Sequence, residues 1–564
     1  MLRRTLCSAA VVGASLSLTG AVAPSGASAA AVPPDAIRVG GPSSPADAKL
    51  AFVGSRVSKV GRAFRVTDAR GRVVLTGRLT AATGTAAPWK RGAIADLSSL
   101  RTPGRYVVRV GALSGRPWTV RSRASSEGVT TILRYFDANR DGDEPSATHR
   151  PAHRNDAAAI VAGGPHDGER IDVAGGWMDA GDMLKFTHTT AYAAAMLQYA
   201  ARLDATDAAR LHAAADTGIR WLVRAHPSAG LFIAQVGDAR DHDLGFRDPV
   251  GDDASGLPGI ETRLAYPGMG GDLGGKAALA LALAADRATG APREQLLQQA
   301  REWYAAGVAA GGVMPSLGGR SGDFYLGDTA EDALAAGAVA LWRVTGERTY
   351  LDDALRNLAA IVPDGRLSWN SVAGLAAADL CGALGRPTVT ADPLASDVAC
   401  KALRAQAAAA VARAKGGAFG TPGAFTWGQT GENGGAGALA ALAGRVGVHP
   451  GALKLGATAR DWLLGRNPWG ASFVAGLGPN APRHLHHWAS VAGDGLPVGA
   501  VVGGPAPLKD IAEQPVGPLV PSQFNTPAAT YEDRTDDYVT SEPAIDYAAG
   551  SILLLAAVDT APAR

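Results

Sequence analysis

Helical stretches separated by long glycine- and proline-rich connections dominate the chain after Ser125. Loops of this length in a compact helical domain tend to carry functional residues. About a dozen helices are more than one bundle needs, so we predict a mainly α domain over 126–564, built as an α/α toroid with six inner and six outer helices. The Ala- and Leu-rich segments include 189–204, 207–225, 273–288, 293–310, 328–345, 397–414 and 544–559.

The chain before Ser125 has a different pattern. Residues 35–123 contain short β-like runs such as Ala63-Phe64-Arg65-Val66 and Arg105 to Val110. Turn residues such as Pro103-Gly104 separate these runs. This pattern predicts a small β-sandwich domain over 35–123.

The overall charge is close to neutral. The 564 residues include 54 Lys and Arg against 52 Asp and Glu, a formal net charge of +2. Nucleic-acid binding requires a basic surface that neutralises phosphates, and this balance supplies no obvious one. We therefore expect no nucleic-acid partner. Hydrophobic residues make up 47% of the chain, enough for a sizeable core.

The first thirty residues have the pattern of a secretory signal peptide. Arg3 and Arg4 precede an apolar run that extends to Val22, and the small residues 27–30 follow. A membrane anchor is the weaker alternative, because glycines and serines interrupt the apolar run. We expect a secreted, extracellular protein with no membrane segment after cleavage near Ala29.

Cleavage removes Cys7 and leaves Cys381 and Cys400. An even pair of cysteines in an oxidising compartment favours a disulfide. Two buried free thiols are the alternative.

The segment Gly175 to Asp182 carries the strongest chemical pattern. Its glycines allow tight bends and leave room for a ligand, and Asp179 and Asp182 lie three residues apart. Two nearby carboxylates can hold and deprotonate a water molecule. The alternatives are a helix N-cap at Asp182 or half of a calcium site.

A second acidic segment runs from Tyr531 to Glu542. Such a run is usually a solvated face. Glu542, however, precedes the apolar stretch that begins at Ala544. Apolar packing raises the pKa of a carboxyl group, so Glu542 is a candidate proton donor.

A third segment, from His484 to Trp488, contains three histidines in four residues. Three histidines permit a transition-metal site, but zinc would need further ligands. Hydrogen bonding to sugar hydroxyls, beside the ring of Trp488, is the interpretation that we favour.

Taken together, these segments resemble glycoside hydrolase family 9, the inverting endoglucanases with an N-terminal immunoglobulin-like domain. The resemblance extends over nearly the whole mature chain. Its further motifs are Ile37-Arg38-Val39, Asp96-Leu97-Ser98, Pro103 to Tyr106, Gly271-Asp272, Gly275-Lys276, Glu331-Asp332, Thr345-Gly346, Tyr350-Leu351, Trp427-Gly428 and Leu464 to Pro468. The resemblance implies that the toroid is an (α/α)6 barrel with a cleft on one face.

The resemblance also implies roles for individual residues. Asp182 matches the general base, Asp179 helps to hold the water, and Glu542 matches the general acid. Asp533 matches an acidic residue of the same signature, and His486 matches the histidine that contacts the sugar ring. Substrate contacts are expected from Trp177, His487, Trp488, Trp427 and Tyr538.

The chain departs from the family pattern near the site. Trp488 stands where the family usually has an arginine that helps to bind glucan, and Met178, Ser541, Pro543 and Ala548 also differ. Many relatives hold zinc through cysteines and histidines upstream of Asp179. Here His149 and His153 remain without a nearby cysteine, so we predict that zinc is absent. The resemblance leads us to expect a calcium ion in the loops, but catalysis requires no cofactor.

The expected function is inverting hydrolysis of β-1,4-glucan by a monomer, on cellulose-type chains, soluble β-glucan or cello-oligosaccharides. The absence of a visible carbohydrate-binding module favours soluble or short substrates. One alternative is an exo-acting β-glycosidase of the same fold, a cellodextrinase or glucosaminidase. Another is a glycan-binding protein without catalysis, which the presence of all three carboxyl groups disfavours.

Overall fold

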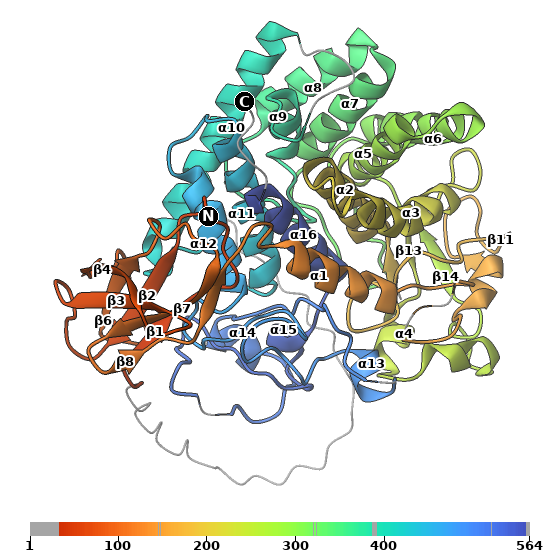
Figure 1. Cartoon of the computed structure of the whole chain (residues 1–564). Helices are drawn as coiled ribbons and strands as arrows, with labels where there is room; N and C mark the ends of the chain where they lie inside the picture. Colours follow the sequence, from red (N-terminus) through yellow and green to blue (C-terminus); the bar gives the residue numbers. More distant parts are fainter. Residues whose placement is uncertain are drawn as a thin grey trace.

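Nine strands between Ala36 and Val120 form a β-sandwich of two antiparallel sheets (Figure 1). The computed structural model describes residues 33–559 except positions 145, 147, 320, 323, 386–391, 494 and 521, so the expected signal peptide lies outside it. One sheet has the order β1-β2-β6-β5, and the other has the order β4-β3-β7-β8 with β9 also paired to β7. The strands are β1 Ala36–Arg38, β2 Leu50–Ser55, β3 Ala63–Asp68, β4 Val73–Arg78, β5 Thr80–Ala81, β6 Arg91–Asp96, β7 Gly104–Val110, β8 Leu113–Ser114 and β9 Trp118–Val120.

Alternating burial along the strands builds the core of the sandwich. On β7 the side chains of Tyr106, Val108 and Val110 are buried, whereas Arg105 on the other face of the strand is exposed. The buried residues of β3, Phe64 and Val66, join the same core. This two-residue period is that of strands with one buried face.

Twelve helices form a closed double ring in the rest of the chain (Figure 1). Each inner helix packs against its two inner neighbours and against at least one outer helix, and α16 packs against α2 to close the ring. The inner helices are α2 Thr187–Leu203, α5 Gly271–Arg287, α7 Glu331–Thr345, α9 Leu375–Leu380, α11 Gln429–Arg445 and α16 Ile545–Asp559. The outer helices are α1 Ser126–Ala138, α3 Ala208–Arg224, α6 Gly290–Ala310, α8 Arg348–Ala360, α10 Pro393–Arg413 and α12 Ala452–Leu463.

Small residues allow the inner helices to lie close together. A Cβ atom added to Gly274 on α5 would come within 2.7 Å of the Cα of Gly307 on α6. One added to Gly275 would come within 2.4 Å of the backbone of Ala333 on α7. The alanine- and glycine-rich sequence of these helices is therefore required by close backbone packing on several sides.

The helical domain also contains strands, which the sequence analysis did not predict. Five short strands form a mixed sheet of order β11-β10-β14-β13-β12. They are β10 Ala159–Val161, β11 Arg170–Ile171, β12 Lys185–Phe186, β13 Ile233–Val236 and β14 Leu264–Pro267. Short helices interrupt the loops: η1 Arg154–Ala158, α4 Ala239–Asp243, η2 Pro249–Ala254, η3 Ala414–Gly416, α13 Trp488–Val491, α14 Leu508–Ala512 and α15 Tyr538–Ser541.

Buried charges and aromatic rings join the sandwich to the ring. Arg460 on α12 is fully buried and forms ion pairs with Asp47 of the sandwich (2.5 Å) and with Asp461 (2.9 Å). Phe52 on β2 packs against Phe419 of the helical domain, with 4.1 Å between ring centroids. The sheet that contains β2 therefore faces the helices.

The observed architecture confirms the predicted fold, an (α/α)6 barrel preceded by an immunoglobulin-like β-sandwich. The predicted disulfide is also present: Cys381 and Cys400 are bonded, with 4.9 Å between their Cα atoms. Within the described residues, no helix combines the length and apolar character that crossing a membrane requires.

Candidate active site

A glycine-rich loop between β11 and β12 places the two predicted aspartates. Gly175 and Gly176 both have φ of +83°, a backbone conformation that favours glycine. Gly181 lies between the two aspartates, and a Cβ atom there would come within 2.2 Å of the carbonyl oxygen of His486. The loop therefore passes directly against the histidine-rich segment only because this position is glycine.

Asp179 is buried at the base of the loop. Its carboxylate accepts hydrogen bonds from the hydroxyl groups of Thr189 and Tyr325, and its backbone N–H donates to Leu184 at 2.9 Å. Burial raises the pKa of Asp179 to about 7. The side chain is thus held in one position by two donors from different parts of the ring.

Asp182 lies nearer the surface, with 18% of its side chain exposed. Its Oδ2 atom is 2.7 Å from Nδ1 of His242, which comes from the short helix α4. The hydrogen bond to Asp182 raises the pKa of His242 to about 9, so the imidazole is a cation at neutral pH. The pair keeps a carboxylate oriented at the surface of the loop.

Glu542 follows α15 and faces the same loop. Its Oε1 accepts a hydrogen bond from the backbone N–H of Gly181 at 3.2 Å. Burial, and then the charge of Asp182, raise the pKa of Glu542 to about 8. Two carboxyl groups more than 350 residues apart in sequence therefore meet across a single glycine, one protonated at neutral pH and the other paired with a cation.

His486 belongs to a row of aromatic rings beside these carboxyl groups. Its ring centroid lies 4.6 Å from that of Phe246 and 5.4 Å from that of Tyr538, and Tyr538 lies 5.5 Å from Trp427. We refer to Phe246, His486, Tyr538 and Trp427 as the aromatic row. Burial lowers the pKa of His486, and its Nδ1–H donates to the carbonyl oxygen of Thr535 at 2.7 Å. Trp427 at the end of the row is 45% exposed.

A cleft of about 540 Å³ opens along this row. Its walls are formed mainly by the histidine-rich segment and the acidic segment that sequence analysis singled out. The lining residues are Phe246, His484, His486, Val491, Pro515, Arg534, Thr535, Asp536 and Tyr538.

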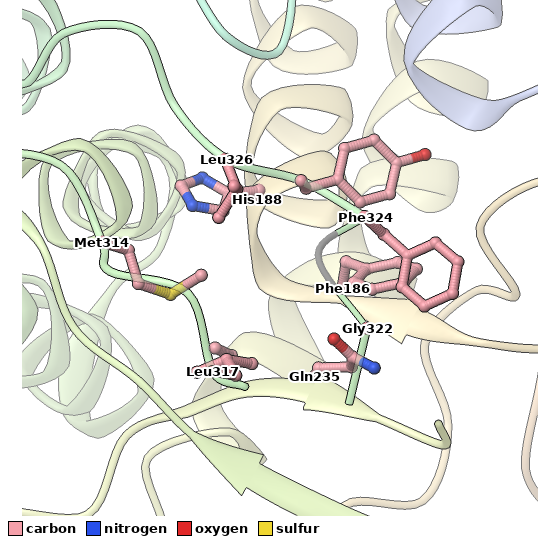
Figure 2. A pocket seen from close by; sticks show the side chains of 10 residues that line it. Phe186, His188, Gln235, Met314, Leu317, Gly322, Phe324 and Leu326 are labelled. Carbon is pink, nitrogen blue, oxygen red and sulfur yellow. The ribbon is translucent and has the colours of Figure 1, made fainter. Parts of the chain in front are cut away.

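Tyr325 is one of the residues that line a second cavity, which Figure 2 shows. Phe186, His188, Phe324 and Met314 surround it, and its volume is only about 10 Å³. This is room for about one water molecule, so the cavity cannot hold a sugar.

The structure corrects three of the predicted substrate contacts. Trp177 and Trp488 are each 1% exposed and His487 is fully buried, so none of them presents a face to the cleft. Trp177 packs against Phe136 with ring centroids 5.1 Å apart, and Trp488 packs among Met178 and other buried residues. These aromatic side chains stabilise the segments on either side of the cleft.

His487 is linked to the aspartate loop through hydrogen bonds of Asn139. Its Nδ1 accepts the N–H of Ala489, so Nε2 donates to the side-chain oxygen of Asn139 at 3.0 Å. Asn139 in turn donates to the carbonyl oxygen of Met178 at 3.0 Å. Burial lowers the pKa of His487 to about 3, which keeps this relay neutral.

Asp533 positions the histidine-rich segment. Its Oδ1 atom accepts hydrogen bonds of 2.9 Å from the backbone N–H groups of Arg483 and His484. His484, His486 and His487 have different hydrogen-bond partners. Among the described residues, no group of three or more His, Cys, Asp or Glu side chains is arranged to hold a metal ion.

A buried ionic network anchors the aspartate loop. Lys185 forms ion pairs with Asp141 (2.9 Å) and Asp156 (2.7 Å) and donates to the carbonyl oxygens of Val173 and Gly175. Within this network, His153 contacts Asp141 at 2.8 Å through one ring nitrogen and Asp252 at 3.1 Å through the other.

The charge state of His153 follows from these contacts. Burial and the nearby Arg263 oppose a positive charge on His153, but Asp141 and Asp252 raise its pKa to about 9. Both ring nitrogens then carry protons and have no lone pair free for a metal.

Sequence reasoning missed His242, Tyr325, Thr189 and Phe246. Each is a single side chain in a loop or at a helix end, and each meets the aspartates or His486 only through folding. His242 lies in the five-residue helix α4, which is too short to show a periodic sequence pattern.

Comparison with known proteins agrees with this geometry. Residues 126–555 match the family model for glycosyl hydrolase family 9, and residues 44–114 match that for the cellulase N-terminal ig-like domain. Endoglucanase 14 of Arabidopsis thaliana is 27% identical over 481 residues, which cover 78% of this chain and 94% of the relative. Endoglucanase 15 of the same plant is 32% identical over 236 residues, covering 40% of this chain and 46% of the relative.

Solved structures show the same fold. A metagenome-derived family 9 endoglucanase aligns with a TM-score of 0.76 and 25% identity, covering 93% of this chain and 99% of the other. A single mutant of a thermostable endoglucanase from Alicyclobacillus acidocaldarius aligns with a TM-score of 0.75 and 24% identity, covering 93% and 100%. The protein is therefore a glycosidase that belongs to glycosyl hydrolase family 9 and carries the immunoglobulin-like domain at its N-terminal side.

Proposed function

We propose that the chain hydrolyses β-1,4-linked glucan with inversion at the anomeric carbon. Support comes from family membership and from relatives named endoglucanases that extend over most of the chain. Glu542 is the general acid, Asp182 is the general base, and Asp179 helps to hold the attacking water.

The pKa of Glu542 supports its role as the acid. With a pKa of about 8 it keeps its proton at neutral pH and can donate it to the glycosidic oxygen as the bond breaks. After donation, the new carboxylate still accepts the N–H of Gly181, which stabilises the charge that has developed.

Asp182 supplies the complementary step. It takes a proton from water while the water oxygen bonds to the anomeric carbon on the face opposite the leaving group. The leaving sugar gains the proton of Glu542, and proton exchange with solvent restores both groups. The imidazolium of His242 orients Asp182 through their 2.7 Å contact, and the carboxyl group of Asp179 contributes a second acceptor for the water.

The contact between Glu542 and Gly181 is the observation that carries this proposal. Glu542 lies directly beside the loop that carries Asp182. The raised pKa of Glu542 and the contact of Asp182 with His242 support different roles for the two carboxyl groups. An inverting reaction needs room for one water between the base and the sugar, with carboxyl groups about 6.5–9.5 Å apart.

The aromatic row supports a sugar chain as the substrate. Aromatic faces pack against the apolar faces of pyranose rings, and the exposed ring of Trp427 lies at the end of the row where a sugar can reach it. We propose that Trp427, Tyr538 and His486 contact the substrate, and that soluble glucan and cello-oligosaccharides bind along the row.

We propose further that the protein is secreted as a monomer after removal of residues 1–30 and that no metal takes part in the reaction. The proposed absence of zinc rests on the doubly hydrogen-bonded His153. Calcium in the loops remains an expectation from the family. N-terminal sequencing of the exported protein, sedimentation velocity and metal analysis test these points separately.

The decisive experiment compares the wild type with Glu542→Gln and Asp182→Asn on soluble cellulose derivatives, mixed-linkage glucan, and cello- and chito-oligosaccharides. Release of reducing sugar with an α-configured initial product, lost by at least about 10³-fold in both variants, is expected for an inverting acid–base pair. The β-anomer, or equal release by the wild type and Glu542→Gln, would overturn the mechanism. Single-sugar release from chain ends would instead identify the exo-acting alternative.

A further inference from the structure

The two domains carry opposite net charge. Residues 35–123 contain 17 Lys and Arg against four Asp and Glu, a formal charge of +13. Residues 124–564 contain 35 Lys and Arg against 48 Asp and Glu, a formal charge of −13. The near-neutral total conceals this asymmetry, so the sequence-based inference that no basic surface exists was wrong for the sandwich.

Four arginines lie on one face of the sandwich. On β3 the buried side chains are Phe64 and Val66, so Arg65 points outward; on β7 the same alternation turns Arg105 and Arg109 outward. Arg78 is the last residue of β4 and pairs with Ala63. Ala63 lies on the outer face of β3, as Arg65 does, so Arg78 lies on the outer face as well. We refer to Arg65, Arg78, Arg105 and Arg109 as the arginine face.

The positive charge on this face is not neutralised within the described residues. Arg65 and Arg109 are direct cross-strand partners, an arrangement of like charges that destabilises a sheet. The acidic residue of these strands, Asp68, is paired with Arg72 at the hairpin. No ion pair joins an acidic side chain to any member of the arginine face in the described part of the chain, and an anion bound across Arg65 and Arg109 would remove their repulsion.

The arginine face is directed away from the helical domain. The sheet with β2 packs against the ring through Phe52, and the loop before it is fixed by the pair of Asp47 and Arg460. The arginine face belongs to the opposite sheet, where Arg65, Arg78 and Arg105 are exposed and Arg109 is half-buried. Figure 1 shows β3 and β4 of this sheet on the side of the sandwich remote from the helices. The face is therefore open to a large partner.

We propose that the arginine face binds a carboxylated polysaccharide, a polyuronate, and so holds the enzyme on an acidic carbohydrate matrix. Planar guanidinium groups pair with carboxylates through two parallel hydrogen bonds, and 14 of the 17 cations of the domain are arginine. The negative helical domain is repelled by such a polymer. The polymer therefore attracts one end of the molecule and leaves the cleft free for neutral glucan.

The aromatic residues of the sandwich favour this partner over two others. Phe52, Phe64, Trp89, Tyr106 and Trp118 are all buried. The face thus has no ring on which bases of single-stranded nucleic acid or the faces of neutral sugars could stack, and no aromatic side chain to enter a lipid surface. Recognition by charge alone suits a regularly carboxylated chain.

Binding of the mature full-length protein to polygalacturonate, measured by affinity electrophoresis and co-sedimentation, tests the proposal. The test variant is Arg65→Ser/Arg105→Ser/Arg109→Ser. The matched control, Lys90→Ser/Arg91→Ser/Arg101→Ser, removes the same charge from the same domain outside the arginine face. Thermal melting confirms that both variants fold.

We expect the test variant to bind at least about tenfold more weakly and the control to change by less than about twofold, since each exposed ion pair is worth up to about 1 kcal/mol. Binding should be lost on fully methyl-esterified polygalacturonate and at 0.5 M salt, where the Debye length is about 4 Å.

Equal weakening of both variants, equal binding to the esterified polymer, or tighter binding to duplex DNA or anionic vesicles would overturn the proposal. Binding by Glu542→Gln separates this outcome from any failure of the catalytic assignment, because the readout does not require hydrolysis. Glucan hydrolysis should be unchanged in both triple variants.

Discussion

Replacing His242 tests how a neighbouring positive charge sets the pKa of Glu542. His242→Gln keeps a hydrogen-bond donor for Asp182 but removes the positive charge, whereas His242→Ala removes both. In the wild type, the pKa of about 9 makes the imidazole a cation throughout the range in which Glu542, with a pKa of about 8, holds its proton. The positive charge of His242 lowers the pKa of Glu542.

The size of the effect follows from the geometry. Opposite charges about 4 Å apart interact by about 4 kcal/mol at an effective dielectric constant of about 20, which is an upper bound. Because 43% of the His242 side chain and 18% of the Asp182 side chain are exposed, the interaction energy of surface ion pairs applies, about 0.2–1 kcal/mol. At 1.36 kcal/mol per pKa unit, removal of the histidine charge should move the alkaline limb of the pH profile, which Glu542 sets, upward by about half a unit.

The assay is kcat/KM on a soluble glucan from pH 4 to pH 10. We expect the alkaline limb to shift upward in His242→Gln. We expect a further loss of kcat in His242→Ala, because the base is no longer oriented. His166→Gln, which removes a surface histidine paired with Glu169, is the matched control. An alkaline limb that stays in place in His242→Gln would refute the reasoning.

Three further outcomes follow from other contacts. Tyr325→Phe removes a hydroxyl that holds the assisting carboxylate, so kcat should fall about tenfold or more with little change in KM; a changed KM alone would contradict this. Asp47→Ala leaves the fully buried Arg460 with one carboxylate fewer and should destabilise the protein by about 3 kcal/mol, seen in thermal melting, with unchanged kcat in the folded enzyme. Glu542→Gln should raise the Tm by several degrees more at pH 9 than at pH 4. The reason is that a carboxyl group whose pKa is raised on folding destabilises the folded state increasingly as the pH rises towards about 8. Equal shifts in Tm at both pH values would argue against a buried, protonated acid.

The sequence predicted the parts of the structure that repeat. Long Ala- and Leu-rich segments predicted the ring because each inner helix must be small or apolar on several sides, and alternating runs predicted the sandwich because each strand has one buried face. The five strands of the small sheet have two to four residues each, too few to show any period. Their pairing depends on contacts between segments tens of residues apart.

The site was predicted unevenly for a similar reason. Asp179, Asp182 and Glu542 lie in distinctive local sequences, so their neighbours along the chain indicate their role. His242 and Tyr325 act only through contacts with residues 60 and 146 positions away, which no local pattern encodes. Trp177, an aromatic residue beside the polar motif, was predicted to contact the sugar. Its side chain instead fills the space between the loop and Phe136.

The acid and the base come together only when the ring of helices is closed. Asp179 and Asp182 lie just before α2, the first inner helix, and Glu542 lies just before α16, the last. These helices meet where the ring closes, and the backbone N–H of Ile545 donates to the carbonyl oxygen of Asp179 at 2.9 Å. The same junction brings together the carboxyl groups of Asp179, Asp182 and Glu542. Protonation of Glu542 and the positive charge of His242 reduce the repulsion between these groups, so the charges that catalysis requires also favour closure of the ring at this junction.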